Sequence, residues 1–360
     1  MAVNLGVCGS SPHVSAIALL AQLIERFCGM EYVGGLSPSQ GSNMDKELKL
    51  VTYNVDGLPD ELDLSTLPWI LRPIAWIYKF FKGTTIVKIN DNGDTSNKTK
   101  SISERLLSLH PHIIGVQEDF NYHNELMSSL NGLYNDSTNG GEILLDKLFS
   151  RTEWLSCFPF PRFKCDGINF ISMNDNRVKV SDEDIIRWKK SYGYFTHAND
   201  KLTHKGFRKY TVRLDDEVDI DVYIVHMDAD FYNAESCPDV SKDIAARESE
   251  LKQLTEYILD RYNSGRTVPV IIMGDTNSSP KYVWDVNNID ENLIKPINSN
   301  VELMISEAEP TNRLDVDRVF YINSLYSKYH ITPKECYFDE SFDRLSDHKP
   351  LVATFNIIKV

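Results

Sequence analysis

The sequence lacks several features that would assign it to a common class. Its apolar stretch at residues 13–27 is too short to span a bilayer and lacks the basic start of a signal peptide. Its six cysteines include no Cys-x-x-Cys pair and no Cys/His cluster at zinc-ligand spacing. Scattered free thiols are therefore expected, with a Cys165–Cys237 bridge as the alternative for an exported protein.

Basic residues are also fewer than acidic ones. Lysine and arginine number 38 against 52 aspartates and glutamates, which gives a net charge of −14. A broad surface for a polyanion is unexpected at this charge, although a local basic groove can still sit on an acidic protein. Extended nucleic acid is therefore disfavoured as a partner but not excluded. The acidic balance suits a site that holds hard cations with carboxylates.

The first 43 residues differ from the rest of the chain. Residues 21–42 resemble the spurious peptides that arise when a transfer-RNA gene is translated. Residues 1–43 are therefore expected to be a spurious or disordered leader, with Met44 as the natural start and 44–360 as one catalytic domain, expected to be a monomer. A start at Met44 implies a cytoplasmic protein, whereas an export signal lost from this region implies a periplasmic or secreted one.

Short apolar runs alternate with helical stretches along the rest of the chain. The runs cover residues 48–55, 112–118, 168–172, 207–214, 218–227, 268–275, 316–322 and 350–357. Residues 100–110 and 243–263 have the apolar spacing of amphipathic helices. Near-continuous apolar strands are expected where helices cover one face of a sheet and a second sheet covers the other. The pattern predicts an α/β fold in which helices cover two packed sheets.

Residues 64–83 break this pattern because aromatic and basic side chains are interleaved there. One interpretation is a helix packed on the sandwich, with prolines that set its bends. The alternative is an interfacial element that contacts a membrane surface or forms a substrate wall, since aromatic and basic residues together suit that environment.

Polar residues stand at the ends of several expected strands. They are Asn54, Glu118, Asp275 with Asn277, and Asp347 with His348. Singly, an Asn or Asp after a strand is most often a turn former. Jointly, they supply carboxylates, amides and a histidine at strand ends, where loops gather into a site. That set favours Mg²⁺ or Mn²⁺.

Six short sequence motifs surround these residues, and their order along the chain is informative. They are TYNVDGLP, GVQED, IVHMDA, MGDTN, VDRVF and LSDHKP. From about Leu48 to the C-terminus, their order and spacing resemble the endonuclease/exonuclease/phosphatase superfamily, which includes deoxyribonuclease I. Six ordered blocks argue against a chance match, whereas one alone would mean little. The resemblance implies a four-layered α/β sandwich of two packed, mainly antiparallel sheets flanked by helices. It also implies a metal-dependent phosphoesterase that uses Mg²⁺ or Mn²⁺.

The resemblance assigns roles to individual residues. Asn54, Glu118 and Asp347 are the implied metal ligands, with Glu118 as the primary one. Asp275 is implied to activate or orient the attacking water, and Asn277 to steady the pentacoordinate phosphorus.

Two histidines complete the implied site. His348 faces the phosphate, and His226 contacts the phosphate or assists the leaving group. Asp317 is the implied partner that fixes the tautomer of His348, with Asp315 as the competing candidate. Such a carboxylate would also favour the charged form of the imidazole.

The branch of the superfamily stays open at this point. The stretch 203–214 resembles bacterial sphingomyelinases, which implies a substrate contact for Lys205. The stretch 226–237 resembles the same group and implies one for Asp228, although a Gln is usual at that position. These details favour a small or lipid-linked phosphoester as substrate, with a phosphodiester preferred. The alternative is a DNA-directed nuclease or an enzyme similar to tyrosyl-DNA phosphodiesterases. A non-catalytic binding protein is the remote alternative, because none of the essential positions is lost.

Overall fold

The computed structural model describes residues 46–57, 95–119, 122–136, 167–192, 200, 205–229, 240–312 and 315–360. All of them belong to one compact unit, Asp45–Val360. The expected leader 1–43, the aromatic segment 64–83 and the Cys165–Cys237 pair lie outside the described residues.

The described chain forms two six-stranded sheets. The first has the order β11 (Tyr329–Phe338), β12 (Leu351–Lys359), β1 (Lys46–Asn54), β2 (Ile113–Gln117), β4 (Asn169–Met173) and β3 (Tyr134–Asp136). The second has the order β5 (Val178–Arg187), β6 (Gly206–Leu214), β7 (Val218–His226), β8 (Val270–Asp275), β10 (Asp317–Ser324) and β9 (Leu303–Glu307). The eight apolar runs expected to be strands coincide with β1, β2, β4, β6, β7, β8, β10 and β12.

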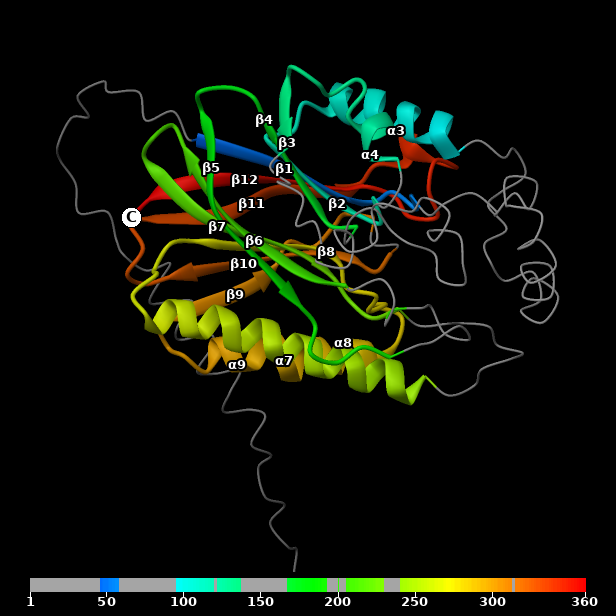
Figure 1. Ribbon diagram of the computed structural model, residues 1–360. Helices are drawn as coiled ribbons and strands as arrows, with labels where there is room; N and C mark the ends of the chain where they lie inside the picture. The colour runs from blue at the N-terminus through cyan, green and yellow to red at the C-terminus, as the bar shows by residue number, and fades with distance from the viewer. Residues whose placement is uncertain are drawn as a thin grey trace, which may run out of the picture. The chain divides into compact units, whose positions relative to one another are not determined.

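Helices cover the outer faces of both sheets (Figure 1). On one side lie α3 (Thr95–Leu109) and α4 (His123–Leu126), and on the other α7 (Ser241–Asn263), α8 (Val283–Ile289) and α9 (Lys295–Asn298). A π-helical turn, Asp290–Ile294, joins the last two, and a 3₁₀ turn, Glu340–Phe342, precedes β12. The helices predicted over 100–110 and 243–263 correspond to α3 and α7.

Three apolar clusters correspond to the three interfaces between these layers. Side chains of both sheets, such as Leu50 and Ile271, form the central cluster. A second cluster joins α7 to the second sheet, and a third joins α3 and α4 to the first. Burial of these side chains is the main favourable contribution to folding. The four-layered sandwich is therefore confirmed.

Two parallel strand pairs in these mostly antiparallel sheets place the strand-end residues together. In β1 and β2 the parallel register sets Asn54 beside Gln117, so Glu118 follows directly. In β7 and β8 it sets His226 beside Asp275. The start of antiparallel β10 brings Asp317 beside the same Asp275. The carboxyl ends of four strands and the start of a fifth therefore contribute to one place.

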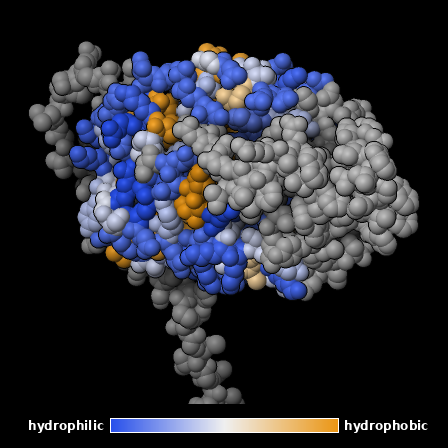
Figure 2. Space-filling model, in the orientation of Figure 1, coloured by the Kyte–Doolittle hydropathy of each residue, from blue (hydrophilic) through white to orange (hydrophobic). Residues whose placement is uncertain are grey.

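On the face shown in Figure 2, the described surface is mainly hydrophilic, and apolar residues occur in small separate patches. Among the described helices, none is both long and apolar enough to cross a membrane.

Candidate metal centre and active site

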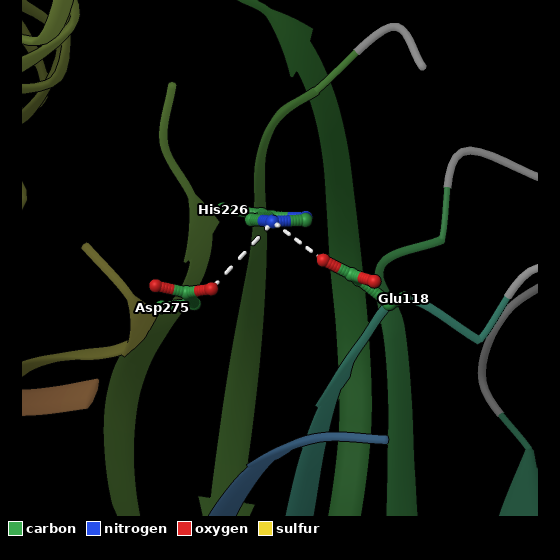
Figure 3. A group of neighbouring side chains, drawn as sticks. All are labelled: Glu118, His226 and Asp275. Carbon is green, nitrogen blue, oxygen red and sulfur yellow. Dashed lines mark ion pairs between the residues drawn. The ribbon is translucent and has the colours of Figure 1, made fainter. Parts of the chain in front are cut away.

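Glu118, His226 and Asp275 form a cluster at the ends of β2, β7 and β8 (Figure 3). His226 Nε2 lies 3.6 Å from Glu118 Oε1 and 3.7 Å from Asp275 Oδ2. One ligand atom from each of the three residues lies within 4.8 Å of the others. These separations are too long for hydrogen bonds but suit three groups arranged around a shared ion.

The side chain of Asn54 connects the two carboxylates of the cluster. Its Nδ2 donates to Glu118 Oε1 at 3.1 Å and to Asp275 Oδ2 at 3.0 Å. Its Oδ1 accepts from the backbone N–H of Asp56 at 3.1 Å. In this orientation the amide nitrogen, and not the oxygen expected of a metal ligand, faces the carboxylates. The ligand role of Asn54 stays a prediction.

The backbone around the cluster adopts a conformation that is uncommon for residues other than glycine. Asp56, Glu118 and Asn277 have φ angles of 46°, 60° and 48°, in the left-handed region. Such conformations cost about 1–3 kcal/mol and occur preferentially at functional sites. Here they turn the chain sharply after β1, β2 and β8.

Gly57 enables the close approach of two of these turns. Its N–H donates to the carbonyl oxygen of Glu118 at 3.0 Å. A Cβ atom at this position would lie 2.5 Å from the same oxygen, well inside van der Waals contact. A side chain at residue 57 would therefore push Glu118 away.

Gly57→Ala is expected to lower the unfolding free energy by about 1–3 kcal/mol, the usual cost of overpacking. It should also lower kcat per folded molecule, because Glu118 shifts. Gly265→Ala is the matched control: φ is +99° there, and a Cβ would meet nothing within 4 Å. The control should lose stability but keep kcat. Chemical denaturation and steady-state kinetics of both variants test this, and an unchanged kcat in Gly57→Ala would contradict it.

His348 and Asp317 form the second feature of the site. His348 Nδ1 lies 2.7 Å from Asp317 Oδ2, and its Nε2 lies 3.9 Å from Asp275 Oδ2. Burial by itself would lower the pKa of His348, but the carboxylates of Asp317 and Asp275 raise it well above the ordinary value. The carboxylates thus favour the charged form of His348, while burial raises the pKa of its partner Asp317 to about 7.

The pKa values of the acidic residues at the site are shifted by burial and by the charges of their neighbours. Burial raises the pKa of Glu118, and burial with the charges of Asp347 and Glu118 raises that of Asp56 to about 7. Burial acts to raise the pKa of Asp275 too, but His348, His226 and Lys205 hold it below the ordinary value. A cation between these carboxylates would relieve the crowding.

His226 provides the observation that tests whether a metal fits. Burial, together with Lys205 and His348, lowers its pKa well below the usual value, so the ring is neutral. Both ring nitrogens are buried and have no hydrogen-bond partner among the described residues. Buried polar atoms are normally satisfied. A neutral imidazole with a vacant nitrogen between two carboxylates is a donor set that could hold a divalent metal.

Comparisons with known proteins agree with this architecture. No protein-family model matches the chain, and no curated protein matches it by sequence. Among solved structures, the endonuclease/exonuclease/phosphatase from Bacteroides vulgatus aligns with a TM-score of 0.51 at 12% identity, covering 87% of this chain and 100% of its own. This chain has the endonuclease/exonuclease/phosphatase fold.

Two further solved structures share that fold. A humanized TDP2 from D. rerio aligns with a TM-score of 0.51 at 16% identity, covering 86% of this chain and 99% of its own. A beta toxin mutant from Staphylococcus aureus with bound magnesium ions aligns with a TM-score of 0.50 at 15% identity, with the same two coverages. At these identities the likeness establishes the endonuclease/exonuclease/phosphatase fold, which hosts several activities.

Within this fold, three other residues singled out from the sequence occupy distinct places. Asp347 is exposed and lies outside the Glu118 cluster, although its charge acts on Glu118 and His348. Lys205 is buried, with Nζ 2.6 Å from Asp200 Oδ1 and donating to Met227 O at 3.0 Å. Asp228 is buried and accepts from the Tyr192 N–H at 2.6 Å. Lys205 and Asp228 thus have protein partners, and their substrate contacts stay a prediction.

Asn277, the remaining candidate, is fixed from two directions. Its backbone N–H donates to Asp275 Oδ1 at 2.8 Å, and its Nδ2 donates to Met227 O at 2.9 Å. The second Nδ2 hydrogen is then the one that could reach a substrate oxygen.

Sequence reasoning missed several residues that support the site. Ser346 Oγ donates to Asn54 O at 2.8 Å and anchors the loop that carries His348. The Trp188 indole N–H donates to His226 O at 2.7 Å. Asp200 pairs with Lys205. Only Ser346 lies in a recognisable block, LSDHKP, because the other two contacts depend on tertiary packing.

Asp317→Asn is expected to lower kcat by about 10-fold, and His348→Ala by about 10²-fold, the scale for losing a positioned acid–base group. The amide cannot stabilise an imidazolium as the carboxylate does. Asp315 Oδ1 accepts from the Val316 N–H, so Asp315→Asn is the control, expected to stay within about twofold. Steady-state kinetics of the three variants test this prediction. A larger loss of kcat in Asp315→Asn than in Asp317→Asn would mean that Asp315 supports His348.

Proposed function

We propose that this protein is a divalent-metal-dependent hydrolase of phosphoester bonds, with a phosphodiester as the preferred substrate and water as the nucleophile. The observation that carries the proposal is the convergence of Glu118, His226 and Asp275 beside the Asp317–His348 pair. Two carboxylates and an imidazole can hold a divalent ion, and an imidazolium can stabilise negative charge on a phosphate.

Glu118, Asp275 and His226 would hold the metal, with Asn54 beside them. When bound, a divalent ion supplies positive charge to the phosphate oxygens, which otherwise repel an incoming nucleophile. Mg²⁺ is our first choice, with Mn²⁺ as the alternative, because carboxylates suit hard cations and the beta toxin mutant of the same fold contains magnesium.

The other groups divide the remaining tasks. Asp275 orients the attacking water and accepts its proton, the P–O bond to the leaving group breaks, and the leaving oxygen takes a proton from solvent. His348, held as an imidazolium by Asp317, donates to a non-bridging phosphate oxygen. The Asn277 amide can donate a further hydrogen bond to the phosphate as it becomes pentacoordinate, and neutral His226 can do so in place of binding the metal. Asp347 stays a candidate for metal binding or proton transfer.

For the substrate we propose a small or lipid-linked phosphoester. The net charge of −14 supports this choice, because a long duplex would meet a repulsive field. Contact of segment 64–83 with a membrane surface is a part of this proposal that lies outside the described residues.

A panel of substrates tests the proposed function. The enzyme is assayed with Mg²⁺, and again with EDTA, on bis-p-nitrophenyl phosphate, p-nitrophenyl phosphate, sphingomyelin, inositol phosphates and plasmid DNA. We expect metal-dependent turnover of a small or lipid-linked ester. Nicking of plasmid DNA alone would replace the proposal with a DNA-directed nuclease or a phosphodiesterase acting on DNA adducts. Binding of a panel member without turnover would indicate a non-catalytic binding protein.

A further inference from the structure

A cavity lies next to residues that contact the backbone of the metal cluster. Its volume is about 600 Å³, within the range of pockets that hold small molecules. It lies between the end of β5, with residues 187–192, and the first turns of α7. Lys205 and Asp200 also contribute to its wall.

The cavity is lined by cations. Arg187, Lys189, Lys190 and Lys242 line it, and Trp188 and Tyr192 add aromatic surface. We call these six residues the basic pocket. The Lys242 ammonium lies 5.2 Å from the centre of the Tyr192 ring. The acidic residue among the described lining is Asp200, and the ammonium of Lys205 at 2.6 Å offsets its charge.

The charges of these four cations are gathered at one cavity. Within the described part, none of the four forms an ion pair with an acidic residue, whereas Lys179, Lys295 and Lys334 each do. In a chain with 52 acidic and 38 basic residues, intramolecular partners are plentiful. The positive end of the 23-residue helix α7 lies at the same cavity. The pocket is therefore a local anion-attracting site on an acidic protein.

Two hydrogen bonds connect the basic pocket to the metal cluster. Trp188 Nε1 donates to the carbonyl of His226, and Lys205 Nζ donates to the carbonyl of Met227. The same Met227 carbonyl accepts from the Asn277 side chain. Two residues that line the pocket, Trp188 and Lys205, therefore contact the backbone of residues 226 and 227, which adjoin the metal cluster.

We propose that the basic pocket binds a second phosphate group of the substrate, so that the substrate is a phosphoester that carries at least one further phosphate. The proposal rests on the proposed function for the identity of the ligand, but the pocket itself can be tested without catalysis. A small soluble molecule and a phospholipid headgroup would present the same chemistry.

Calorimetry with inorganic pyrophosphate tests the pocket in the full chain. The titration is made in EDTA, so that no divalent ion holds the anion at the metal cluster. We expect a Kd of about 1 mM or below for the wild type. The triple variant Lys189→Ala, Lys190→Ala, Lys242→Ala should bind at least about 10-fold more weakly, since charge-assisted contacts to phosphate are lost.

The matched control removes three other exposed lysines. The variant Lys179→Ala, Lys295→Ala, Lys334→Ala changes net charge equally, so any general electrostatic effect appears there too, and we expect a change within about twofold. Glu118→Gln should bind pyrophosphate as the wild type does. Equal weakening in both triple variants, or no binding by the wild type up to about 10 mM, would overturn the proposal.

A vesicle arm distinguishes the two sources of phosphate. Phosphatidylcholine vesicles with and without phosphatidylinositol 4-phosphate are sedimented with the wild type and the pocket variant. If the wild type, but not the pocket variant, binds the vesicles that contain phosphatidylinositol 4-phosphate, the second phosphate belongs to a lipid headgroup. If the wild type binds pyrophosphate but not these vesicles, the second phosphate belongs to a soluble molecule. Tight binding of a single-stranded oligonucleotide without measurable pyrophosphate binding would contradict a small-anion pocket. If the pocket binds pyrophosphate but no phosphoester is hydrolysed, the proposed function fails while the pocket stands.

Discussion

Glu118→Gln is expected to lower kcat/KM by about 10³-fold or more and to weaken Mg²⁺ binding, with the fold intact. The substitution removes the negative charge but keeps an oxygen that can accept the hydrogen bond from Asn54 Nδ2. The loss therefore reports the charge of Glu118, and not its packing. Calorimetric titration with Mg²⁺ and steady-state kinetics on bis-p-nitrophenyl phosphate measure the two effects.

Glu125→Gln is the control for this experiment. Glu125 lies on the short helix α4, near in sequence but outside the cluster. It should leave Mg²⁺ affinity and turnover unchanged. If Glu118→Gln bound Mg²⁺ as tightly as the wild type, the metal centre assigned to β2, β7 and β8 would be wrong.

Asp275→Asn is expected to lower kcat by about 10²- to 10⁴-fold, the range for a positioned general base. Asp275 is the hub of the site: Oδ1 accepts from the Asn277 N–H, and Oδ2 accepts from Asn54 Nδ2. The same Oδ2 faces His226 at 3.7 Å and His348 at 3.9 Å. An amide offers one accepting oxygen in place of two and no charge.

The structural cost of Asp275→Asn must be separated from the catalytic cost. In the variant, an NH₂ group replaces one carboxylate oxygen at position 275, so one hydrogen-bond donor of the site loses its acceptor. This loss lowers the unfolding free energy by about 1–3 kcal/mol. Kinetics are therefore measured well below the melting temperature, with Asp260→Asn on the exposed face of α7 as the control. A kcat within about twofold of the wild type would remove Asp275 from the chemistry.

The strands that the sequence predicted and those that it did not predict differ in their position within the sheets. The apolar runs predicted the strands that lie inside the two sheets, where both faces are covered. The four strands without such a prediction, β3, β5, β9 and β11, are the edges of the sheets. Edge strands carry polar and charged residues that discourage pairing with another chain. β5 contains Asp182, Glu183 and Asp184, and β11 contains Lys334 and Glu335, so hydrophobicity alone could not identify them.

The site was predictable to the extent that it depends on strand ends. Glu118, His226 and Asp275 each close an apolar run, and parallel pairing brings such ends together. The metal ligands predicted from the sequence, Asn54, Glu118 and Asp347, stay a prediction. The structure adds that ligand atoms of Glu118, His226 and Asp275 lie close enough to hold an ion. The direction of each side chain depends on the left-handed turns and on contacts such as Gly57 with Glu118, which no spacing rule supplies.

The central claim is tested most directly by measuring hydrolysis of bis-p-nitrophenyl phosphate before the metal is removed, after its removal and after its return. We expect chelation with EDTA to reduce wild-type activity to about 1% or less, and added Mg²⁺ or Mn²⁺ to restore it with saturation. Glu118→Gln should need far more metal and recover little. Full activity in EDTA, or equal recovery by the wild type and Glu118→Gln, would contradict a metal-dependent reaction at this cluster.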